Sequence, residues 1–512
     1  MVGGFYIGAF DNPSYNDLVS KKLYLLVFAL AFLFRILFIL PGNIILGFDQ
    51  VRDLSSSWSI YKDLDLKIIG PTAGNNPDLH HGILFLYYIL PPLIFFGGSP
   101  IAVALWNAFF NALIYLVLFN FAKSLFKNNK VAIISACLSA VSFYLIEYSA
   151  WISNPSPTLL IVPLFFFFLW KFIDQDSRFM IPAAFFLGLS IQFELFFLYL
   201  IPVFILGILL FRKKDIKQIL FSFAAFCLAT LTMILTEIKY HFSGVRSLLE
   251  SFLVVGTSNQ GFINNLRLFI DRFFETFSQS ILPVSFGKVS GVVVLIVFVL
   301  YLFKKTSDRK ALSFLAVYLF TPFLMLALGY HGAPWFLISL PPAMILLASF
   351  ILSKINSAIL TFIIVLISIV NLNTLRKDKL NGNSILEPDA SAFLSTQLAV
   401  VDYTYKLSNN EPFGINSVTN PLYINAVWSY HYEWYGKKNY GYLPSWWGGD
   451  QLHPSDSLRG PFGNEKYLYV IIDNSLRIPD VHKILGKEWI EKKGETVKEK
   501  NFGAITVLGT RL

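Results

Sequence analysis

Apolar runs of about 15 to 25 residues recur along this chain up to residue 374, and they restrict its fold more than any other feature. A bilayer interior offers no water to backbone N–H and C=O groups, so such a run is stable there as a helix that satisfies its own backbone. We therefore predict an all-α polytopic membrane domain over residues 1–374. Its expected spans, about eleven, lie near residues 23–41, 100–122, 131–148, 158–170, 179–193, 195–211, 218–238, 289–303, 311–329, 334–352 and 357–374.

The composition agrees with this prediction. Hydrophobic residues make up 55% of the 512 residues and charged residues only 14%, whereas about a quarter of the residues in a soluble domain are charged. Much of the net charge of +9 lies in short gaps between apolar runs, where basic residues set topology, so we expect no nucleic-acid partner. Cys137 and Cys227 both fall inside apolar runs, and we predict neither a disulfide nor a thiolate metal site.

Basic residues cluster in alternate gaps between the apolar runs, and this pattern predicts which side each loop faces. The clusters share the cytoplasmic side with Lys21-Lys22 only if the short, proline-broken run 83–97 does not cross the membrane. We therefore predict that 83–97 is a juxtamembrane or re-entrant helix of the first outer loop. In this plasma-membrane topology the first outer loop and the C-terminal region are extracytoplasmic, although the basic stretch 376–379 opposes it.

The composition changes after residue 374, and we predict a small extracytoplasmic α/β domain over residues 375–512. Strands are expected at 467–472 and 504–508, and a helix at 391–407. The middle of this region is rich in aromatic residues, which can stack on sugars, fill a small core or rest on a bilayer. These alternatives stay open for Trp428, Tyr430, Tyr432, Trp434, Tyr435, Tyr440, Tyr442, Trp446 and Trp447.

The stretch from Leu46 to Asp53 directly follows the first apolar run and therefore emerges at the membrane surface. It places Asp49, Arg52 and Asp53 at positions i, i+3 and i+4, on one face of a helical turn. A carboxylate there can take a proton from a hydroxyl group while the guanidinium stabilises a departing phosphate. The alternative is a salt-bridged helix that lies in the interface without a catalytic role.

Two further carboxylates, Glu194 and Glu237, lie at or within apolar runs, where ionisable groups are costly and usually functional. His331 is expected to be an ordinary loop residue. A metal held by Asp49 and Asp53 has no visible third ligand, so we predict no metal and no cofactor, with a divalent ion left open. The sequence also has no phosphate-binding P-loop, no dinucleotide glycine fingerprint and no zinc-spaced His/Cys cluster.

Three short motifs follow one another in the chain: Asp49-Gln50-Val51-Arg52, Gly70-Pro71 with Gly82–Tyr88, and Thr236–Phe242. Their order over roughly residues 20–350 resembles the GT-C superfamily of polyprenyl-phosphate-sugar glycosyltransferases, in particular protein O-mannosyltransferases and lipid A aminoarabinose transferases. The first motif matches that family's Asp-Glu-x-Arg except that Gln50 replaces the glutamate. His80-His81-Gly82 stands where the family has Lys-Pro-Pro or His-Pro-Pro.

The resemblance implies an outward-facing enzyme that transfers one sugar, with inversion, from a polyprenyl phosphate to a hydroxyl of a lipid, glycan or protein acceptor. It makes Asp49 the catalytic base. A donor held in the bilayer also explains why the reactive groups sit at headgroup depth and why no nucleotide-binding domain is present. The residues assigned to substrate binding are Arg52, Asp53, His80, His81, Glu194, Glu237, Lys239 and His241.

Two other functions stay open at this point. A transporter or flippase of lipid-linked sugars would place the same charges along a pathway, and it should show repeat symmetry and paired broken helices. A polymerase or ligase of lipid-linked glycans would use a larger donor. An assay with single-sugar polyprenyl phosphates separates the three functions.

Overall fold

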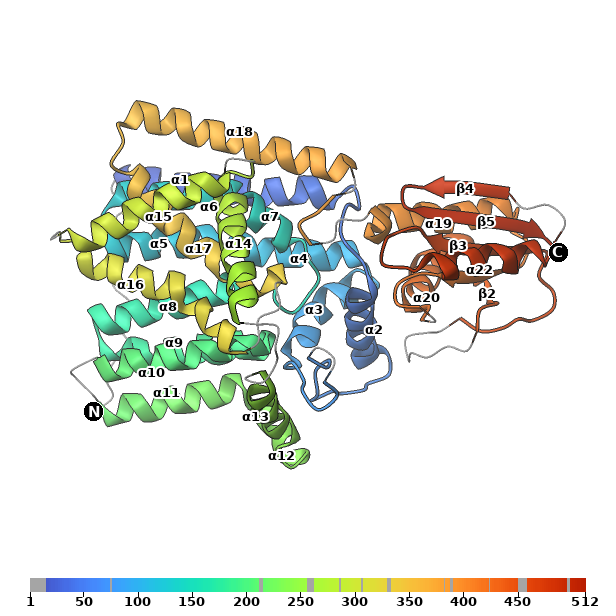
Figure 1. The fold of residues 1–512 in the computed structure, drawn as a ribbon, viewed down its shortest axis with the longest axis horizontal. Coiled ribbons are helices and arrows are strands. Elements are labelled where there is room, and N and C mark those ends of the chain that lie inside the picture. The colour runs from blue at the N-terminus through green and yellow to red at the C-terminus, as the bar shows by residue number, and fades with distance from the viewer. Residues whose placement is uncertain are drawn as a thin grey trace.

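The computed structural model describes residues 15–73, 76–210, 215–255, 262–284, 287–304, 307–328, 333–381, 383–386, 390–422, 424–449, 458–494 and 498–512. His331 lies outside these residues. Figure 1 shows a large helical bundle and a smaller domain built around a sheet, with α2 and α3 between them.

The bundle consists of helices of 7 to 25 residues. Its apolar helices are α1 (Tyr15–Ile39), α4 (Pro100–Ala112), α5 (Ile114–Phe126), α6 (Asn129–Val141), α7 (Phe143–Ser149), α8 (Thr158–Asp174), α9 (Met180–Phe193), α10 (Leu200–Leu210), α11 (Ile216–Ala229), α12 (Leu231–Lys239), α15 (Gly287–Phe303), α16 (Arg309–Phe320), α17 (Leu340–Leu352) and α18 (Ser357–Asn381). The segment between α1 and α4 adds α2 (Phe48–Lys62) and α3 (Leu84–Phe95), and a later segment adds α13 (Ser243–Val255) and α14 (Phe262–Ile281).

The described residues include three continuous helical stretches that are long and apolar enough to cross a membrane: Pro100–Phe126, Arg309–Leu326 and Ser357–Asn381. The number rises to five if each bent pair, α6–α7 with a 53° bend and α11–α12 with a 70° bend, is one span. Shorter apolar helices account for six further segments. The chain is thus a multi-pass membrane protein, while the count of eleven spans stays a prediction.

Aromatic and small side chains together form the core of the bundle. The rings of Phe166 on α8 and Tyr318 on α16 stack with their centroids 3.7 Å apart. A Cβ added at Gly188 on α9 would lie 2.7 Å from the Cβ of Ala229 on α11. Because there is no room for that atom, a glycine is what lets α9 and α11 approach closely, as small residues do in membrane helix pairs.

Helix α3 occupies the middle of the segment 83–97. At 12 residues it is roughly 18 Å long, which is well short of a bilayer core of roughly 30 Å. It packs against α2 and α4. Its length is compatible with the predicted juxtamembrane or re-entrant helix, and that 83–97 does not cross the membrane stays a prediction.

One of the basic residues that oppose the predicted orientation has a buried partner. Lys379, near the end of α18, lies 2.8 Å from Glu147 of α7, and both side chains are largely buried. Glu147 also accepts a hydrogen bond from Ser384. Lys379 is thus held in a buried ion pair within the fold.

We expect a fusion of alkaline phosphatase after Leu380 to be active, because α18 then ends outside the cytoplasm. The matched fusion after Lys310, in a predicted cytoplasmic gap, should be inactive. Reporter activity in intact cells measures both. An inactive fusion at Leu380 would overturn the orientation of the C-terminal domain.

The C-terminal domain has a five-stranded sheet in the order β2-β1-β3-β5-β4. The strands are β1 (Phe413–Val418), β2 (Ser445–Trp446), β3 (Tyr467–Asp473), β4 (Lys498–Phe502) and β5 (Ile505–Arg511). The first three are parallel, and β5 is antiparallel to both β3 and β4. The α/β prediction is confirmed, with β3 and β5 at the two predicted strands.

Helices cover both faces of this sheet. On one face α19 (Leu394–Leu407), α20 (Ala426–His431) and the π-helical turn Tyr432–Gly436 pack against the strands, followed by α21 (Lys437–Tyr440), and on the other face lies α22 (Asp480–Glu491). Trp428, Tyr432 and Trp446 are buried in the first of these interfaces. Filling a small core is therefore what these three aromatic residues do. The predicted boundary at residue 374 falls inside α18, which continues to Asn381.

Candidate active site

Helix α2 presents the Asp49–Arg52–Asp53 face because its opposite side is packed. Val51, Leu54 and Ile60 are buried against α3, and Ser57 Oγ donates a hydrogen bond of 2.7 Å to the carbonyl of Leu86. At the start of the helix the Gln50 amide oxygen accepts from the backbone N–H of Gly47 at 2.9 Å. The residue that departs from the family motif thus stabilises the N-terminus of α2.

The segment just before α2 is held by the C-terminal domain. The N–H of Leu46 donates to the carbonyl of Ala392 (2.8 Å), and the N–H of Leu394 donates to the carbonyl of Ile44 (3.0 Å). Gln397, which is buried, donates to the carbonyl of Leu46 at 3.0 Å, and its oxygen lies 2.8 Å from His431 Nε2. Two parts of the chain about 350 residues apart therefore fix the start of α2 together.

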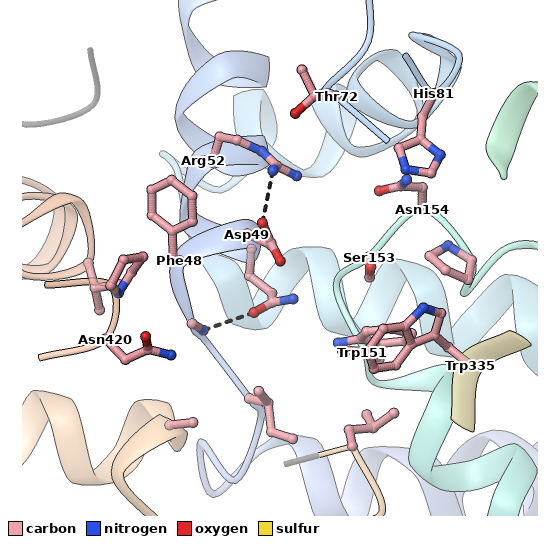
Figure 2. A pocket seen from close by; sticks show the side chains of 18 of the residues that line it. Phe48, Asp49, Arg52, Thr72, His81, Trp151, Ser153, Asn154, Trp335 and Asn420 are labelled. Carbon is pink, nitrogen blue, oxygen red and sulfur yellow. Dashed lines mark hydrogen bonds and ion pairs between the residues drawn. The ribbon is translucent and has the colours of Figure 1, made fainter. Parts of the chain in front are cut away.

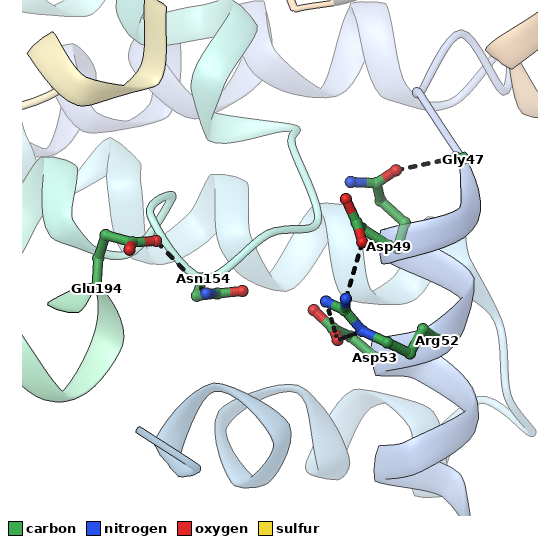
Figure 3. Close-up of polar contacts among 7 residues, drawn as sticks. Gly47, Asp49, Arg52, Asp53, Asn154 and Glu194 are labelled. Carbon is green, nitrogen blue, oxygen red and sulfur yellow. Dashed lines mark hydrogen bonds and ion pairs between the residues drawn. The ribbon is translucent and has the colours of Figure 1, made fainter. Parts of the chain in front are cut away.

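Arg52 bridges both carboxylates of its turn (Figure 3). Its Nη1 lies 2.8 Å from Asp49 Oδ1, and its Nε and Nη2 each lie 2.9 Å from Asp53 Oδ1. The Asp49 side chain is 67% exposed, the Arg52 side chain 22% and the Asp53 side chain 3%. Asp49 is consequently the carboxylate that a substrate can reach, and Asp53 is a buried support for Arg52.

Burial raises the pKa of Asp53 to about 6, against the opposing effect of Arg52. The folded protein then binds a proton at Asp53 in a pH range where the unfolded chain has released it. Stability from this group is complete below the ordinary pKa of an aspartate and is lost as the pH rises through about 6.

Asp53→Asn should therefore gain thermal stability relative to the wild type as the pH is raised from about 4 to about 7, because asparagine does not titrate. The measurement is the difference between the two Tm values in detergent at several pH values. Asn439→Ala, at an exposed asparagine, serves as the control and should show a constant difference, because neither residue titrates. A difference in Tm that does not change with pH for Asp53→Asn would show that burial does not raise the pKa of Asp53.

A second polar group lies across the same cavity. His81 Nδ1 lies 2.9 Å from Glu194 Oε1, and Asn154 Nδ2 donates to Glu194 Oε2 at 3.4 Å. Burial acts to lower the pKa of His81, but the carboxylates of Glu194 and Asp53 outweigh it and hold the pKa above its ordinary value. The site therefore favours an imidazolium at His81, a second cation near Arg52.

Asp49 and Arg52 of the first group and His81, Asn154 and Glu194 of the second line one cavity of about 1120 Å³. Figure 2 shows Asp49 and Arg52 facing Ser153, Asn154, Trp151 and Trp335 across it. The indole rings of Trp151 and Trp335 lie 6.1 Å apart, and Phe196 and Phe336 meet edge to face at 4.9 Å. One wall is thus aromatic, and the C-terminal domain contributes another through Thr419, Asn420, Pro421, Asp473, Ser475, Arg477 and Ile505.

A second cavity of about 350 Å³ adjoins the first and shares five lining residues with it: Leu79, His81, Leu195, Leu198 and Leu248. It is mostly apolar, and α11, α12 and α13 line much of it. His80 and Glu237 lie here, with His80 Nδ1 3.0 Å from the carbonyl of Gly70 and Glu237 accepting from the N–H of Val245.

The predicted site residues thus divide into three groups. Asp49, Arg52, His81 and Glu194 line the large cavity, with Asp53 beneath Arg52. His80 and Glu237 line the second cavity. Lys239 and His241 are exposed and line neither cavity.

Several residues that line the large cavity lie outside the sequence prediction. Asn154, Trp151 and Ser153 belong to a short gap between two apolar runs that has no lysine or arginine, and that uncharged polar gap was their one sequence signal. Asn420 and Ser475 follow strands about 50 residues apart, so only the fold brings them together. In the described part of the chain no three His, Cys, Asp or Glu side chains gather closely enough to hold a metal ion.

Comparison with known proteins identifies the fold. No protein-family model matches the sequence, and no curated protein matches it. Among solved structures, ArnT from Cupriavidus metallidurans in the apo state superposes with a TM-score of 0.57 at 11% identity, over 96% of this chain and 98% of that chain. The same protein bound to undecaprenyl phosphate gives a TM-score of 0.56 at 10% identity, with the same coverage. The chain therefore has the fold of ArnT, the GT-C fold that the motifs predict.

Proposed function

We propose that this protein is a membrane glycosyltransferase that moves a single sugar from a polyprenyl phosphate to an acceptor hydroxyl, with inversion. The observation that carries the proposal is the Asp49–Arg52 pair, which lines the large cavity at the first turn of α2. The similarity in fold to ArnT bound to undecaprenyl phosphate supports the choice of a polyprenyl phosphate as the donor.

The reaction follows from the roles of these two side chains. The Asp49 carboxylate takes the proton of the acceptor hydroxyl while its oxygen forms a bond to the anomeric carbon. The bond from that carbon to the phosphate oxygen breaks on the opposite face, and its electron pair leaves with the polyprenyl phosphate. Arg52, with His81 nearby, stabilises the charge that develops on the phosphate.

The contact between Asp49 and Arg52 couples donor binding to this step. Nη1 of Arg52 lies 2.8 Å from Asp49 Oδ1. A donor phosphate competes for the same N–H, and it thereby releases the carboxylate oxygen that accepts the proton. Asp53 retains its own contacts to Nε and Nη2, so the guanidinium stays in place.

The second cavity supports a lipid-linked donor. Its lining is mostly apolar, through residues such as Phe226, Met233, Ile234 and Val245, and it meets the large cavity at His81. An isoprenoid chain can bury apolar area there while its phosphate remains beside His81 and Arg52.

A transporter of lipid-linked sugars is the second candidate, because the two bent helix pairs α6–α7 and α11–α12 resemble the broken helices of such proteins. Asp49 and Arg52, however, lie on α2, outside both pairs, and a transporter leaves the contribution of the C-terminal sheet to the cavity unexplained.

The deciding experiment uses purified protein in proteoliposomes with radiolabelled single-sugar polyprenyl phosphates and an envelope extract as the acceptor. We expect label in the acceptor fraction together with release of polyprenyl phosphate. Movement of intact donor across the bilayer without bond formation would support the transporter, and transfer only from oligosaccharide donors would support the polymerase or ligase.

A further inference from the structure

The carboxyl ends of strands β1 and β3 point at the large cavity. Thr419, Asn420 and Pro421 directly follow β1, and Asp473, Ser475 and Arg477 end or follow β3, and all six residues line the cavity. The two strands are adjacent and parallel over their whole length. Their ends therefore form one crevice that opens toward α2.

This crevice is a topological switch point of the sheet. After β1 the chain continues into α20, which packs on the same face as α19, whereas after β3 it continues into α22 on the opposite face. In open α/β sheets, ligands bind outside the carboxyl ends of the strands at the place where the connections diverge in this way.

The polar groups in the crevice are suited to hydroxyl groups. The Ser475 hydroxyl is buried, with only 7% of the residue exposed, and has no hydrogen-bond partner among the described residues. The backbone of this turn is fixed, because the N–H of Ser475 donates to Asp473 Oδ1 at 2.9 Å. A buried hydroxyl without a partner costs free energy, and a ligand hydroxyl can satisfy it.

The crevice lies on the other side of Asp49 from the aromatic wall. Figure 2 shows Asn420 beyond Phe48 on one side of Asp49, with Ser153, Trp151 and Trp335 on the other. In an inverting displacement the acceptor and the leaving phosphate occupy opposite faces of the sugar. The second cavity, where the donor lipid is proposed to bind, meets the large cavity at His81, toward the bundle. The crevice is therefore placed for the acceptor.

We propose that the β1–β3 crevice, through Asn420 and Ser475, binds the carbohydrate portion of the acceptor and presents its hydroxyl to Asp49. This inference rests on the proposed glycosyl transfer and deepens it by naming the acceptor as a glycan or glycolipid. The C-terminal domain is then a substrate-binding domain.

The test uses the full-length protein in nanodiscs and the variants Asn420→Ala and Ser475→Ala. Asn439→Ala, at an exposed asparagine of α21 that does not line the cavity, is the matched control. The acceptor probe is the oligosaccharide and glycolipid fraction of cell envelopes, titrated against a fixed amount of labelled donor. Binding of undecaprenyl phosphate and of the oligosaccharide fraction is measured separately by calorimetry.

Each cavity variant should raise the acceptor concentration needed for half-maximal transfer by about tenfold, the loss expected for a hydrogen bond in a dry site. Transfer at saturating acceptor and the Kd for undecaprenyl phosphate should stay within about twofold of the wild type, which also shows that the variants fold. The control should change neither. An unchanged dependence on acceptor concentration would overturn the inference, whether or not the affinity for undecaprenyl phosphate or donor becomes tenfold weaker.

The two proposals fail separately. If the wild type transfers no sugar, the proposed reaction is wrong. Calorimetry with the oligosaccharide fraction then tests whether the crevice binds carbohydrate. Binding to the wild type that Asn420→Ala and Ser475→Ala weaken about tenfold supports a carbohydrate site. Equal binding to all proteins, or none to the wild type, overturns it.

Discussion

Asp49→Asn should lower turnover by at least roughly 100-fold, the usual loss on removing a general base. Asparagine keeps the size of the side chain, and a hydrogen bond from Arg52 to its oxygen remains possible, but it cannot accept the hydroxyl proton. The measurement is single-turnover transfer from saturating donor, with undecaprenyl-phosphate affinity as a check on folding. Asp65→Asn, at an exposed aspartate outside the cavity, is the matched control and should be near wild type.

Two results would place the base elsewhere. One is near-normal turnover of purified Asp49→Asn. The other is a larger defect in Asp53→Asn, because Asp53 is 3% exposed and is expected only to orient Arg52. Glu237 is the next candidate, although its carboxylate lies in the second cavity and accepts from the backbone of α13.

Arg52→Ala should cost on the order of 2–4 kcal/mol of stabilisation for the developing phosphate charge, or roughly 30-fold to 1000-fold in rate. Arg52→Lys should recover only part of this loss, because a lysine offers a point charge where the guanidinium contacts both Asp49 and Asp53. Donor affinity and single-turnover rate are both measured. Wild-type values for Arg52→Ala would show that Arg52 does not serve the phosphate.

Removing Arg52 also leaves the buried Asp53 without its partner, which is destabilising in itself. The double variant Arg52→Ala/Asp53→Asn removes that effect. If the rate loss comes from the phosphate interaction, the double variant should be as slow as Arg52→Ala while its Tm recovers. Arg178→Ala, which removes an exposed arginine paired with Asp176, controls for the loss of a surface salt bridge.

The fold class could be predicted from the sequence because the membrane imposes a length and a polarity on every span. The turn with Asp49, Arg52 and Asp53 could also be predicted, since helical spacing alone brings these three side chains together. The bends between α6 and α7 and between α11 and α12 could not be predicted, because the two halves of each pair form one uninterrupted apolar run.

The opposite wall of the cavity depended on tertiary structure. His81 and Glu194 are more than 110 residues apart, and they share no sequence motif, so nothing in the pattern pairs them. Lys239 and His241 belong to a motif that spans the end of α12 and the turn after it, and both side chains lie at the surface. Local spacing finds one helical turn, but it cannot show which loops the bundle and the sheet bring to it.

The hydrogen bonds between residues 42–46 and 391–397 have a consequence for engineering this chain. A chimera that joins the bundle of this protein to the C-terminal domain of another at residue 381 removes Gln397 and leaves the carbonyls of Ile44 and Leu46 with foreign partners. The start of α2 would then be misplaced even if both halves folded. Residues 42–46 and 391–397 therefore have to be exchanged together if the proposed acceptor site is to be transferred with the C-terminal domain.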